Sequence, residues 1–206
     1  MARIDDYQHA REIAVEALSR ETLAAISRRS GYETADAASG TLVIPFLDRT
    51  YSLEYPGLRF SDGLKAEAEV PLQEQVLILH YLLGAEAGLP SQDWVAYREI
   101  AGASFYFSAF VKRAIEPLKK VFGRNAAAFR NAAAALGGQA IPAGDAGFEL
   151  RVFPQVAVQF ILWEGDEEFG AEANILFNQG IEGRLSPEDI AWLAGMVVYR
   201  MIALSR

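Results

Sequence analysis

The N-terminal third of the chain changes its hydrophobic period twice. Residues 5–29 carry apolar side chains at helical spacing, which predicts a helix there. Residues 42–46 then alternate apolar and other side chains, and the alternation resumes at residue 51 after a turn at 47–49. This pattern predicts a β-hairpin, with Pro45 on an edge strand because proline cannot donate a hydrogen bond to a sheet.

Further helices are expected in the middle of the chain. The segment 68–88 is apolar nearly all round, so its helix belongs at the centre of the domain. A second helix spans Phe105 to Phe122, and a third follows Asn125, a residue type that caps helices. Glycines end these helices: Gly84 or Gly88, Gly123, and Gly137–Gly138.

The last third of the chain carries strand signals and one strong helix signal. Residues 148–154 and 156–163 are predicted as strands, and the second is apolar on both faces, which is typical of a central strand. A short helix is expected around residues 172–177. The final helix begins with Ser186 as its N-cap and Pro187 at its first position.

The order of these elements predicts an α+β fold. We expect a mainly helical single domain over residues 1–206, with a β-hairpin near the N-terminus. A small, mostly antiparallel sheet should include a central strand near residues 155–163. A chain of this length suits one domain of ordinary size.

Charge and cysteine content narrow the classes of partner and cofactor. The chain has 27 acidic against 19 basic residues, and this net charge of −8 repels phosphate backbones, so we expect no nucleic-acid partner. No apolar run approaches the ~18 residues of a membrane helix, and the charged N-terminus lacks a secretory core. We therefore expect a cytoplasmic protein with no membrane partner. The absence of cysteine excludes disulfides, thiolate catalysis and an iron–sulfur cluster.

The sequence also lacks the familiar catalytic motifs. It contains no G-x-S-x-G elbow, phosphate-binding loop, dinucleotide fingerprint or H-E-x-x-H zinc motif. Whether the protein is an enzyme is therefore left open.

Three consecutive acids, Asp166, Glu167 and Glu168, follow the predicted central strand. They could cap the helix expected next, because carboxylates accept hydrogen bonds from the N–H groups at a helix start. They could instead bind a hard divalent cation such as Mg²⁺ or Ca²⁺, or form an acid–base pair. The sequence does not choose among these readings, and a divalent cation is the candidate cofactor.

Two other sets of side chains are candidates for a ligand pocket. His80 shares a stripe of its apolar helix with Val76 and Leu83, next to Tyr81. Buried histidines are usually neutral and satisfied by a hydrogen bond, but such a group can also line a pocket. The aromatic residues at 105–110 could wall the same pocket, although at this spacing aromatic residues usually belong to the core.

Two short strings and the residues between them resemble a known family. The run Leu79 to Leu82 (LHYL) and the run Trp163 to Phe169 (WEGDEEF) occur in order, with Asp145 and Pro154 between them. They are similar to the bacterial and archaeal family known as domain of unknown function 3786, from about Tyr7 to the C-terminus.

The resemblance implies no activity, because none is assigned to the family. Its members look typical of anaerobes, and some carry an extra cysteine-rich segment that suggests an iron–sulfur cluster, which this chain cannot bind without cysteine. This chain departs from the family at Asn178, where aspartate is expected, and at Gly170, where proline is common. The family pattern implies these polar and aromatic signature residues: His80, Tyr81, Asp145, Trp163, Asp166, Glu167, Glu168 and Phe169.

Three hypotheses for the function follow. The first is a ligand- or cofactor-binding accessory module that uses the signature residues His80, Tyr81, Asp145, Trp163 and Phe169. The second is a metal-dependent enzyme with its ion on Asp166, Glu167 and Glu168. The third is an interaction or assembly module that binds a protein partner through the acidic segment or through an exposed aromatic face.

Overall fold

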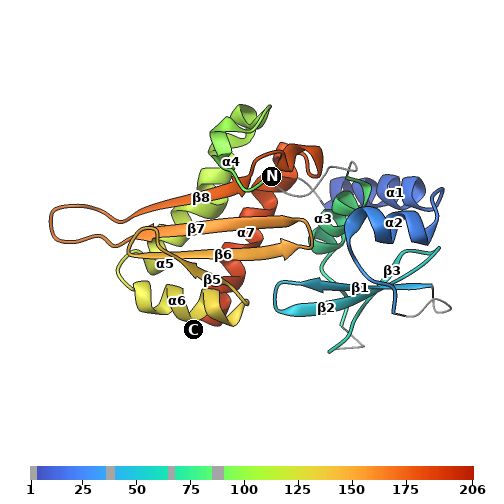
Figure 1. Ribbon diagram of the computed structural model, residues 1–206, viewed down its shortest axis with the longest axis horizontal. Helices are drawn as coiled ribbons and strands as arrows, with labels where there is room; N and C mark the ends of the chain where they lie inside the picture. The colour runs from blue at the N-terminus through green and yellow to red at the C-terminus, as the bar shows by residue number, and fades with distance from the viewer. Residues whose placement is uncertain (1–3, 36–39, 65–67, 85–90) are drawn as a thin grey trace. The chain divides into compact units, whose positions relative to one another are not determined.

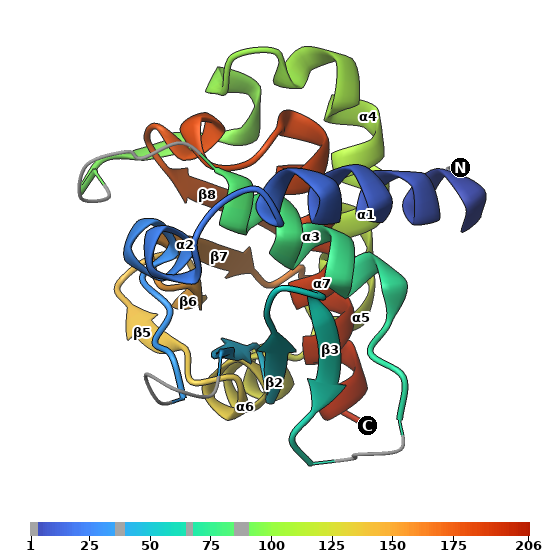
Figure 2. The same ribbon diagram turned by 90° about the vertical axis from the view of Figure 1, so that its right-hand side faces the viewer.

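The computed structural model describes residues 4–35, 40–64, 68–84 and 91–206 and confirms the α+β class. Its contacts divide the chain into two compact units. Unit 1 comprises Met1–Gly88 and Gly183–Leu185, and unit 2 comprises Leu89–Glu182 and Ser186–Arg206. Figure 1 shows the elements of both, and Figure 2 turns unit 1 toward the viewer.

In unit 1, helices α1 (Ile4–Leu18) and α2 (Leu23–Ser30) both pack against α3 (Leu72–Leu83) (Figure 2). The prediction of one helix over residues 5–29 is wrong, because the chain leaves α1 after Leu18. Thr22 then starts α2, and its hydroxyl accepts a hydrogen bond from the Ala25 N–H at 3.2 Å.

The central apolar helix is confirmed as α3, which is buried along most of its length. It ends before Gly84, one of the two predicted ends. The other, Gly88, lies outside the described residues.

The smaller sheet of unit 1 contains the predicted hairpin. Strands β1 (Thr41–Phe46) and β2 (Arg49–Glu54) pair antiparallel, and β1 is an edge strand, so Pro45 lies where the sequence placed it. Strand β3 (Arg59–Asp62) extends the sheet on the other side of β2. It was not predicted, because four residues with one buried side chain carry little periodic signal.

The helices of unit 2 follow the sequence closely. Asn125 accepts a hydrogen bond from the Ala128 N–H at 2.9 Å, and the hydroxyl of Ser186 accepts one from the Asp189 N–H at 3.2 Å, so both predicted caps are confirmed. Of the described helices, none is long and apolar enough to cross a membrane. The helical segments are η1 (Tyr97–Glu99), η2 (Ala103–Tyr106), α4 (Phe107–Phe110), the π-helix η3 (Val111–Ile115), α5 (Glu116–Phe122), α6 (Ala126–Ala135), η4 (Ile181–Gly183) and α7 (Pro187–Leu204).

The aromatic residues at 105–110 do not form one core cluster. Phe110 is buried and stacks on Tyr97 with ring centroids 4.3 Å apart. Phe105 is 83 % exposed, so its assignment to the core is wrong. It lies in the short helix η2, where the chain turns too tightly to bury every ring.

The larger sheet lies in unit 2, in the order β4-β8-β7-β6-β5. Its strands are β4 (Trp94–Ala96), β5 (Gln139–Ile141), β6 (Ala146–Phe153), β7 (Val156–Trp163) and β8 (Glu172–Asn178). The predicted central strand is β7, which is buried on both faces as expected. Helices α5 and α6 pack on this sheet, α5 on β8 and α6 on β6 (Figure 1).

The helix predicted around residues 172–177 is a strand, β8, and that prediction is wrong. Its buried residues Ile175 and Phe177 are two apart, which is the period of a strand. All of β8 except its last residue pairs with β7, from Glu172 opposite Trp163 to Phe177 opposite Val158. Pairing with a buried central strand outweighs the weak local preference of this short segment for helix.

The chain returns briefly to unit 1 at Gly183–Leu185. This segment lies directly against the end of α3: a Cβ atom added to Gly84 would lie 2.6 Å from the backbone oxygen of Arg184. Only glycine allows that approach. Burial lowers the pKa of the Arg184 guanidinium from its ordinary value.

Candidate functional site

The first signature run lies in α3 of unit 1, where Tyr81 links two helices. Its hydroxyl donates a hydrogen bond to the Ser30 carbonyl at 2.6 Å, and its ring meets Tyr32 edge-on with centroids 5.9 Å apart. Burial, and then the nearby Tyr81, raise the pKa of Tyr32 well above its ordinary value. His80, the other polar residue of the run, is half-buried. These contacts make Tyr81 a structural link between α2 and α3.

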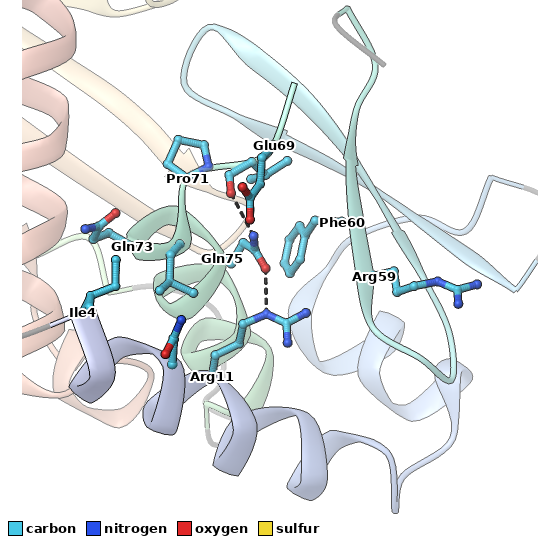
Figure 3. A pocket seen from close by; sticks show the side chains of 11 residues that line it. Ile4, Arg11, Arg59, Phe60, Glu69, Pro71, Gln73 and Gln75 are labelled. Atoms are coloured by element: carbon cyan, nitrogen blue, oxygen red, sulfur yellow. Dashed lines mark hydrogen bonds between the residues drawn. The ribbon is translucent and has the colours of Figure 1, made fainter. Parts of the chain in front are cut away.

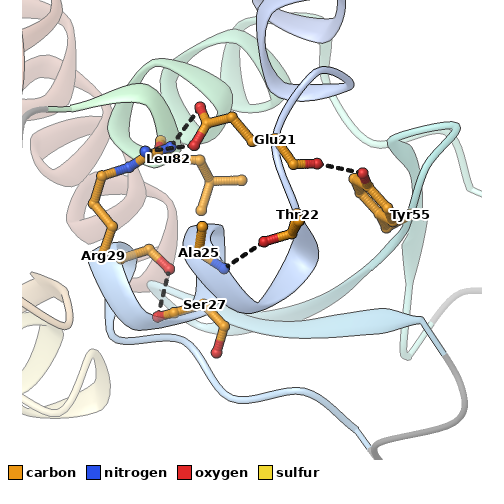
Figure 4. A network of polar contacts seen from close by, with 8 residues as sticks. Glu21, Thr22, Ala25, Ser27, Arg29, Tyr55 and Leu82 are labelled. Carbon is orange, nitrogen blue, oxygen red and sulfur yellow. Dashed lines mark hydrogen bonds and ion pairs between the residues drawn. The ribbon is translucent and has the colours of Figure 1, made fainter.

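The next residue of this run, Leu82, is held by a second contact with α2 (Figure 4). Arg29 donates two hydrogen bonds to the Leu82 carbonyl, from Nε at 2.9 Å and from Nη2 at 2.6 Å. The same guanidinium binds both carboxylate oxygens of Glu21, at 2.6 and 2.9 Å. The backbone oxygen of Glu21 in turn accepts a hydrogen bond from Tyr55. The α3 end of the signature is thus part of a continuous polar network in unit 1.

The second signature run lies in unit 2, at one end of the larger sheet. Asp145 accepts a hydrogen bond from the Glu164 N–H at 2.7 Å, and its own N–H donates to the Leu162 carbonyl at 2.8 Å. The Glu164 carboxylate accepts one from the Ala126 N–H at 2.8 Å, at the first residue of α6. An acid of this segment therefore does cap a helix, but the helix is α6, far away in the sequence.

The loop at residues 164–171, called here the β7–β8 loop, is further fixed by Asp166. One oxygen of this carboxylate accepts hydrogen bonds from the N–H groups of Phe169 at 2.7 Å and Glu168 at 2.8 Å. These bonds hold the pKa of the exposed Asp166 carboxyl below its ordinary value. The N–H of Gly165 donates to the Gly123 carbonyl at 2.9 Å, which fastens the loop to the end of α5.

Other signature side chains of this loop face solvent. Phe169 is 71 % exposed and Trp163, just before the loop, is 41 % exposed. Glu167 and Glu168 are exposed too. Within residues 4–35, 40–64, 68–84 and 91–206, no three acids or histidines come together in a group that could hold a metal ion. The metal hypothesis for Asp166, Glu167 and Glu168 therefore stays a prediction without support from the geometry.

Asn178, where the family pattern predicts aspartate, is a buried part of the sheet. Its Oδ1 accepts a hydrogen bond from the Ala157 N–H at 2.9 Å, and its Nδ2 donates one to the Ser91 carbonyl at 3.1 Å. An ionised aspartate could accept the first bond but could not donate the second. The two hydrogen bonds together therefore require an amide side chain at this position.

Unit 1 contains a pocket of ≈ 800 Å³ between α1, β3 and the start of α3 (Figure 3). Its lining combines apolar groups with three amides, one of them buried, two guanidinium groups and one carboxylate. The lining residues are Ile4, Gln8, Arg11, Arg59, Phe60, Glu69, Val70, Pro71, Leu72, Gln73 and Gln75. None of the signature residues belongs to this set.

One side of the pocket is organised around the buried Gln75. Its Oε1 accepts a hydrogen bond from Arg11 Nε at 2.7 Å, and its Nε2 donates one to the Val70 carbonyl at 2.8 Å (Figure 3). Arg11 also donates from Nη2 to the Leu58 carbonyl at 3.3 Å. Sequence reasoning missed this site, because its residues are scattered over α1, β3 and α3 and include no recognisable motif.

Smaller hollows occur in unit 2. Asp145 lines one of ≈ 170 Å³ and Asn178 one of ≈ 330 Å³. Ligand pockets commonly measure about 300–1,000 Å³. The hollow at Asn178 and the pocket of unit 1 both fall in this range, and the pocket of unit 1 is the larger of the two, so we take it as the candidate small-molecule site in the described residues.

The chain was compared with protein families, curated proteins and solved structures. No curated protein and no solved structure matches the chain. Both signature runs lie within residues 22–200, and this segment matches a family profile. The chain therefore belongs to the family described as Domain of unknown function (DUF3786).

Proposed function

We propose that this protein is a small-ligand-binding module and that the pocket of unit 1 is its binding site. The observation that carries the proposal is the pocket itself: ≈ 800 Å³ lies within the ordinary size range of ligand sites. The proposal keeps the cytoplasmic setting that was expected from the sequence.

The lining suits a small organic molecule with both apolar and polar parts. Phe60, Val70 and Leu72 offer apolar surface, while Gln8 and Gln73 offer amide groups that can both donate and accept hydrogen bonds. Ligand sites commonly combine apolar surface with polar groups that fix the orientation of the ligand.

The pocket does not rest on the family signature. Helix α1, which supplies Ile4, Gln8 and Arg11, precedes the matched segment 22–200. The ligand is therefore proposed for this chain, and relatives that lack an equivalent of α1 would have a different site or none.

Nuclear magnetic resonance of the whole chain tests the proposal. Small aromatic acids, amides and alcohols would be added as probes. We expect the protein amides whose chemical shifts change to cluster on α1, β3 and the start of α3. Gln8→Trp should abolish these changes by filling the pocket. The matched control is His9→Trp on the same helix, since His9 is exposed and does not line the pocket. Shift changes elsewhere, or none, would contradict the proposal.

A second candidate function, binding of a protein partner, is supported by the β7–β8 loop. Its backbone is fastened by Asp166 and Gly165, yet Phe169, which follows the exposed Glu167 and Glu168, is 71 % exposed. Rigid aromatic residues are common anchors in protein interfaces. Phe169→Ala should abolish capture of a partner without changing stability, whereas Phe105→Ala, which removes another exposed ring of unit 2, should not.

A further inference from the structure

We infer that the ligand of the unit 1 pocket carries an anionic group, a carboxylate or a phosphate, and that Arg11 receives it. This inference rests on the proposed function. Its basis is a half-buried guanidinium at the pocket wall whose partners are neutral.

The two hydrogen bonds of Arg11 go to an amide oxygen and a backbone carbonyl. A guanidinium has five N–H donors, so its other donors stay available. Among the described residues no carboxylate lies within 4.0 Å of Arg11. Figure 3 shows its guanidinium below Gln75 and the ring of Phe60, at the wall of the pocket.

Two other half-buried arginines of the same unit show the usual arrangement. Arg29 binds Glu21 at 2.6 Å, and Arg49 binds Asp62 at 2.6 Å. Such pairing is expected, because a charge partly withdrawn from water is stabilised by an opposite charge. Arg11 is also partly withdrawn from water. It faces the pocket, whereas Arg29 and Arg49 each face a carboxylate. An anionic ligand would supply the missing charge.

The guanidinium of Arg11 is held in place before a ligand arrives. Gln75 is only 8 % exposed, and its amide is fixed at both ends by Arg11 and by the Val70 carbonyl. Holding the arginine in one orientation lowers the entropy cost of binding. The planar fork of arginine matches carboxylate and phosphate oxygens in the same way, so both anions fit. Gln75 is thus a positioning residue for Arg11.

The other charged groups of the pocket do not take this role. Arg59 points away from Arg11 in Figure 3 and is paired with Glu54 at 2.8 Å. Glu69 lies on the far side of Gln75 from the Arg11 guanidinium (Figure 3). Its negative charge weakens the attraction for an anion without cancelling it, so removal of that charge should strengthen anion binding.

The test compares three probes that share one ring: benzoate, phenyl phosphate and the neutral benzyl alcohol. With the whole chain, we expect at least one of the anions to bind about tenfold or more tightly than the alcohol, as hydrogen bonds to a charged group imply. The two anions separate a carboxylate ligand from a phosphate ligand. Arg11→Gln should remove this preference and leave the alcohol affinity unchanged. Arg20→Gln, which removes an exposed arginine of the same unit that does not line the pocket, is the matched control and should leave both affinities unchanged.

Two further variants keep the test decisive if Arg11→Gln disturbs folding. Arg11→Lys keeps the positive charge but not the planar fork, so part of the preference should remain. Glu69→Gln should tighten binding of the anion severalfold. Equal affinity for anions and alcohol at the pocket would overturn the inference and leave the pocket proposal standing. Failure of every probe to bind there would overturn both.

Discussion

Carboxylates at the end of the larger sheet accept hydrogen bonds from the backbone. Asp145, Glu164 and Asp166 each accept hydrogen bonds from main-chain N–H groups of other residues. The acids of the family signature thus include residues that shape a loop, together with Glu167 and Glu168, which face solvent.

Replacement of Asp166 tests this reading. Asp166→Ala should speed amide hydrogen exchange at Glu168 and Phe169, because both N–H groups lose their acceptor. Global stability should change little, since the carboxyl is fully exposed. Asp166→Asn, which keeps an acceptor oxygen, should preserve most of the protection. Equal exchange in wild type and Asp166→Ala would contradict the assigned role.

The same hydrogen bonds predict a pH dependence of the loop. The bond from Phe169, and then the bond from Glu168, lower the pKa of Asp166 from its ordinary value of 3.8. Their stabilisation is therefore fully present above pH 3.8 and is lost as the pH falls through the lower pKa of the folded loop. The amide proton shift of Phe169, followed during acidification, should change with a midpoint below 3.8. A midpoint at or above this value would oppose the prediction.

For single residues, the sequence identified unusual positions, but it did not predict the contacts that these residues make. Tyr81 stood out beside a histidine in an apolar run, but its hydrogen bond to Ser30 depends on a helix 51 residues earlier in the chain. Arg11 and Gln75 carried no signal at all, because a lone arginine and a lone glutamine on helices usually face solvent.

At the scale of elements, α6 has a cap supplied from another part of the chain. The N–H of Ala128 donates a hydrogen bond to the side chain of Asn125, the residue just before α6. The N–H of Ala126 donates one to the carboxylate of Glu164 in the β7–β8 loop. Gly123 makes the close approach possible, since a Cβ atom there would lie 2.5 Å from the Cβ of Ala171. The loop and the helix start therefore form one structural group.

Loss of the Glu164 carboxylate should destabilise the fold slightly. We expect Glu164→Ala to lower the free energy of unfolding by about 1 kcal/mol, the usual effect of losing a helix cap. Glu164→Gln should recover part of this, because its amide oxygen can accept the bond from Ala126. Glu167→Ala removes an exposed acid from the same loop and serves as the control. Urea unfolding of the variants measures the differences, and equal values for Glu164→Ala and Glu167→Ala would refute the cap.

Elements with a long, regular hydrophobic period were predictable, and short elements were not. The helices α3, α6 and α7 and the strand β7 follow from periodicity and caps. The error at β8 arose because seven residues carry too few periods to separate a strand from a helix, and only pairing with β7 decides.

For the whole molecule, net charge is the property that follows most directly from the sequence. With a net charge of −8, the chain should repel nucleic acids. We expect no retardation of duplex DNA or single-stranded RNA in gel-shift assays at low salt, where electrostatic binding is strongest. Binding that weakens steeply with added salt would show a basic surface that the net charge conceals, and would contradict this expectation.

The return of the chain to unit 1 has a consequence for the order in which the protein is made. Roughly 95 residues separate Gly88 from Gly183, whose segment lies against Gly84. At ~5–20 residues per second, a ribosome needs about 5–20 s to cover that distance. Until then the nascent unit 1 lacks the backbone that lies against the end of α3, so it stays incompletely packed until the segment Gly183–Leu185 has been synthesised.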